Sequence, residues 1–165
     1  MKTQPSNAAA FTLSEVLVAA ALSGLVLAMF LTLLVKSLGI WRDGTARLQL
    51  SEHSRVTRER VLHGLDGQFG LRHASRAQLS YTTNQISFSD VSASNAFTLL
   101  LNTNQPAAYS NNVGQRRLIQ SRTFVDQVSI ATNGNIVSIN LTLAMTNGWK
   151  KYTQPQQIRV YLLNE

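Results

Sequence analysis

The chain reads AFTLSEVLVAAALSGLVLAMFLTLLV at residues 10–35. The last 20 of these positions, Val16 to Val35, carry no charged side chain. At about 1.5 Å of rise per helical residue they span roughly 30 Å, the thickness of the hydrocarbon core of a bilayer. The stretch therefore predicts a membrane-spanning helix and argues against a purely cytosolic protein.

The small residues and the apolar segment come in the opposite order from that of a secretory signal. Such a signal places its small-residue cleavage site after the apolar segment, whereas here three alanines, residues 8–10, precede it. Cleavage after Ala10 would leave the apolar segment on the product. We therefore interpret the segment as an anchor or an assembly element.

A carboxylate stands at the start of the apolar run. An acidic side chain within a membrane helix costs about 2.5 to 3.5 kcal/mol, least near the helix ends, and such groups usually have a partner. Lys2 lies thirteen positions before Glu15, and Lys36 lies beyond the far end of the run. If the chain began at Phe11, its ammonium group would be one helical turn from Glu15. We expect the partner to be that new amino terminus or a group on another molecule.

Residues 10–19 resemble the prepilin signal of type IV pilins and type II secretion pseudopilins: a small residue, then Phe, Thr, Leu, any residue and Glu, then a long apolar run. The resemblance implies that a membrane prepilin peptidase cuts between Ala10 and Phe11 on the cytoplasmic side and methylates the Phe11 amine. It also implies that Glu15 meets the Phe11 amine of a neighbouring subunit. Most family members have Gly in place of Ala10. The Pro common in major pilins is absent, with Thr32 near its place, so a more continuous helix is expected.

A plain signal anchor is the alternative to this interpretation. Lys36, Arg42 and Arg47 follow the apolar run, whereas only Lys2 precedes it. The positive-inside rule alone would therefore place the carboxyl side in the cytoplasm. We follow the compound motif, which places the chain in the inner membrane with its C-terminal part in the periplasm, because charge bias is only a tendency.

A long amphipathic helix is predicted to continue after Val35. We interpret a set of apolar residues at spacings of seven or fourteen as one buried stripe, interrupted by Arg55. The set is Trp41, Leu48, Leu62 and Phe69. Glycines at 64, 67 and 70 are stop signals, so we expect helix from about Thr12 to about Leu65.

The chain from about Ala77 onward is rich in Ser, Thr, Asn and Gln, with β-branched runs that favour strands. The predicted strands are residues 78–82, 85–89, 97–101, 124–131, 136–143 and a last one around 158–162. Asn133-Gly134 is a strong turn signal, and residues 102–115 are predicted to be a long loop. The fold class expected is α+β and pilin-like, with one long N-terminal helix packed on an antiparallel sheet of about four to six strands.

The expected organisation has four parts: a leader at 1–10, a transmembrane and assembly helix at 11–36, an amphipathic continuation at 37–70 and a β-rich head at 71–165. The arginine-laced helix and the terminal segment 158–164 look most like those of J-type minor pseudopilins or W-type minor pilins.

The net charge of +7 suggests nucleic acid or anionic lipid as a partner. Between residues 42 and 76, however, seven arginines are mixed with four acidic residues, which is typical of a solvated helix face. A second candidate is a basic and aromatic group that could stack bases and bind phosphates. It consists of Trp149, Lys150, Lys151 and Tyr152. Two lysines make few phosphate contacts, so we favour a turn whose rings pack on the sheet.

No catalytic or metal-binding pattern is present in the sequence. It has no Gly-x-Ser-x-Gly motif, and His53, His63 and His73 stand ten residues apart, without metal-ligand spacing. The absence of cysteine excludes disulfides and thiolate metal sites. We therefore expect no enzyme activity, no cofactor and no metal.

The function expected is that of a non-enzymatic filament subunit, a minor pilin or minor pseudopilin of a type IV pilus or a type II secretion pseudopilus. Its partners would be prepilin peptidase, other subunits through helix packing, and the inner membrane before assembly. Two alternatives stay open. One is a DNA-binding minor pilin of an uptake system, and the other is a signal-anchored periplasmic domain that never assembles.

Overall fold

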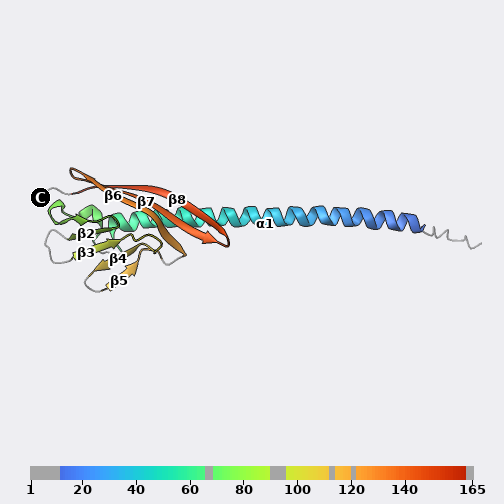
Figure 1. The fold of residues 1–165 in the computed structure, drawn as a ribbon, viewed down its shortest axis with the longest axis horizontal. Coiled ribbons are helices and arrows are strands. Elements are labelled where there is room, and N and C mark those ends of the chain that lie inside the picture. Colours follow the sequence, from blue (N-terminus) through green and yellow to red (C-terminus); the bar gives the residue numbers. More distant parts are fainter. Residues whose placement is uncertain (1–11, 66–68, 90–95, 112–113, 120–121, 163–165) are drawn as a thin grey trace, which may run out of the picture. The chain divides into compact units, whose positions relative to one another are not determined.

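The computed structural model describes residues 12–65, 69–89, 96–111, 114–119 and 122–162 (Figure 1). The chain divides into two compact units, Met1–Asp43 and Gly44–Glu165. One helix, α1 (Leu13–His63), runs for 51 residues. The helix predicted from about Thr12 to about Leu65 is confirmed to within two residues at each end.

Helix α1 ends as its sequence predicts, at a glycine. Gly64 has φ +84°, and its N–H donates to the Arg60 carbonyl at 2.9 Å. A glycine in the left-handed conformation is the usual way to terminate a helix, because it has no Cβ to clash there.

Two antiparallel sheets follow the helix, where a single sheet of four to six strands was expected. The first sheet has the order β1-β2-β3-β4-β5 and the second the order β6-β7-β8. The strands are β1 (Ser80–Tyr81), β2 (Gln85–Ser89), β3 (Ala96–Leu100), β4 (Ala108–Asn111), β5 (Gly114–Arg117), β6 (Thr123–Asn133), β7 (Ile136–Asn147) and β8 (Lys150–Tyr161). The α+β class with one long N-terminal helix is confirmed.

The long loop predicted at residues 102–115 was wrong in its second half. Ala108–Asn111 form β4 and Gly114–Arg117 form β5, and Leu99 of β3 pairs with Tyr109 of β4. Tyr109 is 3% exposed, and its hydroxyl donates to the Phe69 carbonyl at 2.6 Å. Burial of this ring and pairing with β3 outweigh the Asn-rich composition that suggested a loop.

The strands of the second sheet were predicted in the correct places but are longer than expected. Asn133 pairs with Ile136 across a two-residue turn, and Gly134 has φ +58°. The inner face of the sheet is apolar, as alternation predicted for its last strand. Ile139, Leu141 and Ile158 on this face are at most 1% exposed.

The face of α1 that packs on the sheets differs from the first half of the predicted stripe, whereas Leu62 and Phe69 of its second half do pack against the core. Its buried residues are Ala46, Leu50, Ser54, Thr57 and Val61, whereas Trp41 and Leu48 are 66% and 73% exposed. Small and hydroxyl side chains are therefore part of this buried face, and the polar atoms of Ser54 and Thr57 are partnered. Ser54 donates to the Gln156 Oε1 at 2.7 Å, and Thr57 donates to the His53 carbonyl at 2.7 Å.

Candidate assembly site at the start of the helix

The described chain begins with a hydrogen-bonded helix start built from two side chains. The Thr12 N–H donates to Glu15 Oε2 at 2.9 Å, and the Thr12 hydroxyl donates to the same oxygen at 3.0 Å. The Glu15 N–H points back to the Thr12 hydroxyl oxygen at 3.4 Å. Thr12 is therefore the N-cap of α1, and Glu15 closes a capping box with it.

This arrangement gives Glu15 a local partner that the sequence analysis did not consider. The Thr-x-x-Glu spacing before an apolar run is the signal that could have revealed it. The capping box satisfies amide hydrogens that every helix leaves unpaired at its start, and it places a negative charge at the positive end of the helix dipole. The capping box supplies no positive charge, so it does not replace the cationic partner predicted for Glu15.

Glu15 lies on a continuous face of α1. An open groove of about 330 Å³ runs along this face and is lined by Ser14, Glu15, Val18, Ala19 and Leu22. Apart from Glu15 these side chains are apolar or small, so the face suits packing against another helix with the carboxylate at its edge.

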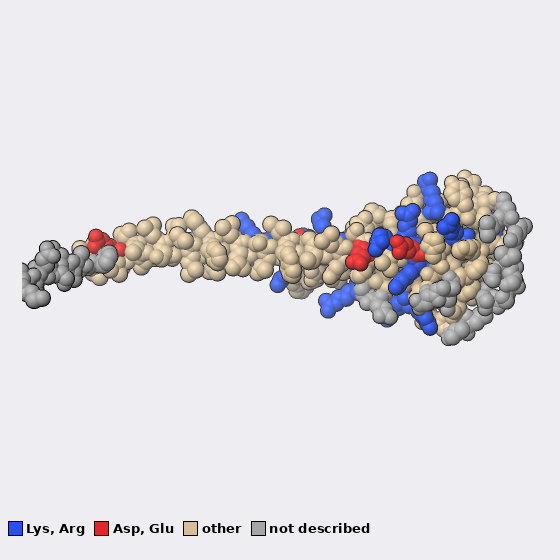
Figure 2. All heavy atoms as spheres, turned by 180° about the vertical axis from the view of Figure 1, so that it is seen from behind, with Lys and Arg blue, Asp and Glu red and all other residues tan. Residues whose placement is uncertain are grey.

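The helix beyond Glu15 exposes its apolar side chains. The large apolar residues from Leu13 to Val35 are 41% to 78% exposed, and Figure 2 shows a stretch of helix without charged side chains. Ser23 and Thr32 donate to the carbonyls of Ala19 and Ala28, at 2.7 and 2.8 Å. These bonds hide the hydroxyls from an apolar surrounding. By length and composition, α1 is able to cross a membrane.

The two residues of the predicted cleavage site, Ala10 and Phe11, lie outside the described residues. Cleavage between them and methylation of Phe11 stay predictions, as does the role of Glu15 in assembly.

The two aromatic rings of the basic and aromatic group at residues 149–152 lie in different surroundings. Tyr152 is 7% exposed and packs in the core, whereas Trp149 is fully exposed at 108%. Lys151 is 2.6 Å from Asp126 and 5.9 Å from the centre of the Phe124 ring. The expectation that both rings pack on the sheet is thus correct for Tyr152 and wrong for Trp149.

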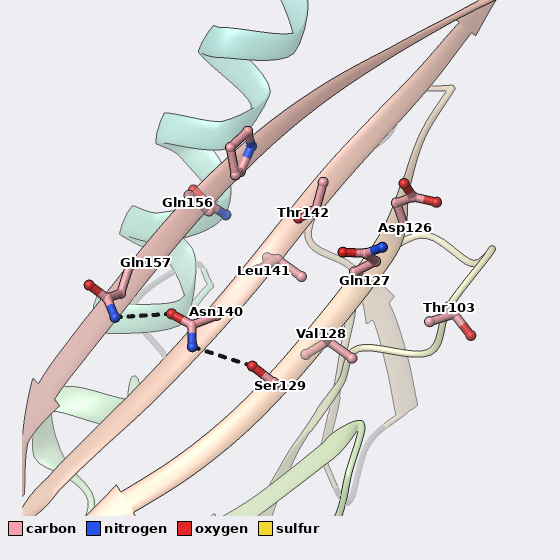
Figure 3. Close-up of a pocket in the computed structure, with 11 residues that line it drawn as sticks. Thr103, Asp126, Gln127, Val128, Ser129, Asn140, Leu141, Thr142, Gln156 and Gln157 are labelled. Atoms are coloured by element: carbon pink, nitrogen blue, oxygen red, sulfur yellow. Dashed lines mark hydrogen bonds between the residues drawn. The ribbon is translucent and has the colours of Figure 1, made fainter.

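A concavity of about 720 Å³ lies over β6, β7 and β8. Figure 3 shows a row of amides and a hydroxyl across the strands: Gln157 donates to Asn140 at 3.0 Å, and Asn140 donates to Ser129 at 3.3 Å. The charged residue in its lining, Asp126, is held by Lys151. Such neutral groups are not a nucleophile and base pair.

The three histidines lie apart in different surroundings. His53 Nδ1 is 2.8 Å from the Thr123 hydroxyl, His63 is the last residue of α1, and His73 is in a short 3₁₀ helix at Leu71–His73. Within the described part of the chain, no three His, Asp or Glu residues come together as a metal site would require.

Comparison with known proteins finds one family signature. Residues 5–31 match the signature described as the prokaryotic N-terminal methylation motif. No curated protein and no solved structure matches the chain. The N terminus therefore carries the prepilin-type methylation motif by which the type IV pilin and pseudopilin family is recognised.

Proposed function

We propose that this chain is a non-enzymatic filament subunit, a minor pilin or minor pseudopilin, that prepilin peptidase cleaves between Ala10 and Phe11 and methylates on Phe11. Residues 1–10 are the leader, 11–36 the membrane and assembly helix, 37–70 the segment that holds its amphipathic continuation as far as His63, and 71–165 the head. Before assembly the chain is anchored in the inner membrane with its head in the periplasm. It then joins a type IV pilus or a secretion pseudopilus.

One observation supports this proposal most strongly: the methylation motif leads directly into a helix whose apolar side chains are not buried within the described chain. None of the most apolar 18-residue window of α1 is buried within the chain, and isolated proteins rarely leave so large an apolar surface in water. A membrane covers such a helix before assembly, and a bundle of identical or related helices covers it afterwards.

The processing step is tested by following the chain in cells with and without prepilin peptidase. We expect the chain to lose its first ten residues only when the peptidase is present. The Ala10→Leu variant should stay uncut, because the site must accept a small side chain, whereas Ala10→Gly should be cut at least as well. Equal lengths with and without the peptidase, measured by intact mass, would contradict the proposal.

A further inference from the structure

The hairpin between β7 and β8 displays a tryptophan at its tip. Asn147 and Lys150 form the last pair of twelve in register, and the two residues between them, Gly148 and Trp149, make the turn. Gly148 has φ +64° and is the turn residue with positive φ, which matches a type II′ turn with glycine first. A regular hairpin, rather than a loose loop, therefore holds the Trp149 indole fully outside the fold.

Cationic side chains and an apolar one lie beside the first residues of β8, which directly follow this tip. A groove of about 480 Å³ separates the first residues of β8 from α1, and its lining includes Arg47, Leu48 and Lys150. Leu48 is 73% exposed, and the Lys150 ammonium lies 5.4 Å from the centre of the Tyr152 ring. None of the described residues that line this groove is acidic. We name Arg47, Leu48, Trp149 and Lys150 the hairpin patch.

The hairpin patch belongs to the second compact unit, and Arg47 lies three residues after the start of that unit at Gly44. Twelve residues separate Val35, the end of the apolar run, from Arg47, and a chain of that length spans at most about 43 Å. The anchor therefore tethers the patch within this distance of the membrane. Tethering makes weak contacts effective, because the second binding event becomes intramolecular.

We propose that the hairpin patch docks on the anionic headgroups of the inner membrane before the subunit joins a filament, with the Trp149 indole at the interface and Arg47 and Lys150 on lipid phosphates. Tryptophan favours this interface because it has an apolar body and one polar N–H. Lysine and arginine reach from apolar stems toward phosphates. The proposal rests on the membrane anchoring proposed above, and it explains why an apolar ring is displayed beside cations rather than packed on the sheet.

The test uses the full chain in vesicles of phosphatidylcholine and phosphatidylglycerol that carry a nitroxide on some headgroups. The Trp41→Phe variant leaves Trp149 as the one tryptophan. We expect the nitroxide to quench Trp149 emission roughly twofold more than the emission of a control tryptophan at the far end of β8. The control combines Trp41→Phe and Trp149→Phe with Tyr161→Trp. Tyr161 is 73% exposed. It lies at the other end of β8, eleven residues or about 36 Å along the strand from Lys150.

Two changes of charge, one in the protein and one in the lipid, test the contact with the headgroups. In the Trp41→Phe background, Lys150→Gln with Arg47→Gln should lower the quenching of Trp149, and removing phosphatidylglycerol should lower it as well. Equal quenching at positions 149 and 161, or quenching that ignores phosphatidylglycerol, would overturn the proposal. So would a Trp149 emission that responds to added DNA and not to lipid.

Flotation of the same vesicles separates this proposal from the one it rests on. If the chain floats with the vesicles but Trp149 behaves as the control does, the docking is wrong and the anchor stands. If the chain does not float, the anchor is wrong and the docking falls with it.

Discussion

Replacing Glu15 by alanine is expected to leave the chain processed and anchored but to lower its assembly at least tenfold. A carboxylate at the centre of a membrane helix costs about 2.5 to 3.5 kcal/mol, and the cost is smaller near a helix end, where Glu15 lies. Pairing with the Phe11 amine of a neighbour recovers this cost only in the filament. A factor of ten corresponds to about 1.4 kcal/mol, which is roughly half of the cost at the helix centre. The measurement is cross-linking of a cysteine placed near position 15 to partner subunits.

Two further variants separate intermolecular pairing from local helix capping. Glu15→Asp keeps the charge but is one methylene shorter, so it should assemble partly. Thr12→Ala removes the hydroxyl that closes the capping box with Glu15, and it should still assemble, because the carboxylate is kept. Assembly of Thr12→Ala as poor as that of Glu15→Ala would assign Glu15 to capping. Normal assembly of both Glu15→Gln and Glu15→Ala would mean that Glu15 only lies among the lipid headgroups at the helix boundary and has no role in assembly.

Replacing Gly70 by alanine is expected to destabilise the head by about 3 kcal/mol or more. A Cβ on Gly70 would overlap the Leu62 carbonyl oxygen and the Gly64 nitrogen. These are backbone atoms at the end of α1, where the Gly64 N–H bonds to the Arg60 carbonyl. They cannot give way without opening the helix cap. Gly70 has φ −97°, so the cost comes from lack of space rather than from the backbone conformation.

The matched control for Gly70 is Gly44→Ala. A Cβ at Gly44 would have no atom within 4 Å, and alanine in a helix is favoured over glycine by about 0.5 to 1 kcal/mol. Urea unfolding of the two full-length variants in detergent, followed by circular dichroism, should thus show a lower midpoint for Gly70→Ala and an unchanged or higher one for Gly44→Ala. Equal midpoints would mean that the close packing at Gly70 is not needed.

The elements that the sequence predicted best are those with a local physical signal. Helix α1 follows from an apolar run and a glycine stop, and the β6–β7 hairpin follows from alternation around Asn133-Gly134. The buried face of α1 could be predicted in this way only near its end, where Leu62 packs against the core. Periodicity selected Leu48 because it is apolar, but the residues buried in that part of the helix include the small Ala46, Ser54 and Thr57.

The missed features depend on contacts between segments distant in sequence. Strand β4 exists because Tyr109 is buried against β3, which no window around residues 102–115 reveals. The position of Trp149 depends on where the tip of a twelve-pair hairpin ends. The capping box of Thr12 and Glu15 was different, since its spacing is in the sequence.

We propose that this chain becomes a filament subunit after cleavage at Ala10. Mass spectrometry of the chain recovered from sheared filaments or from purified secretion complexes tests this proposal. We predict a chain that starts at Phe11 with one methyl group on its amine, in the same fraction as the other subunits. A chain that still starts at Met1, or one found in the membrane and never with other subunits, would contradict the claim.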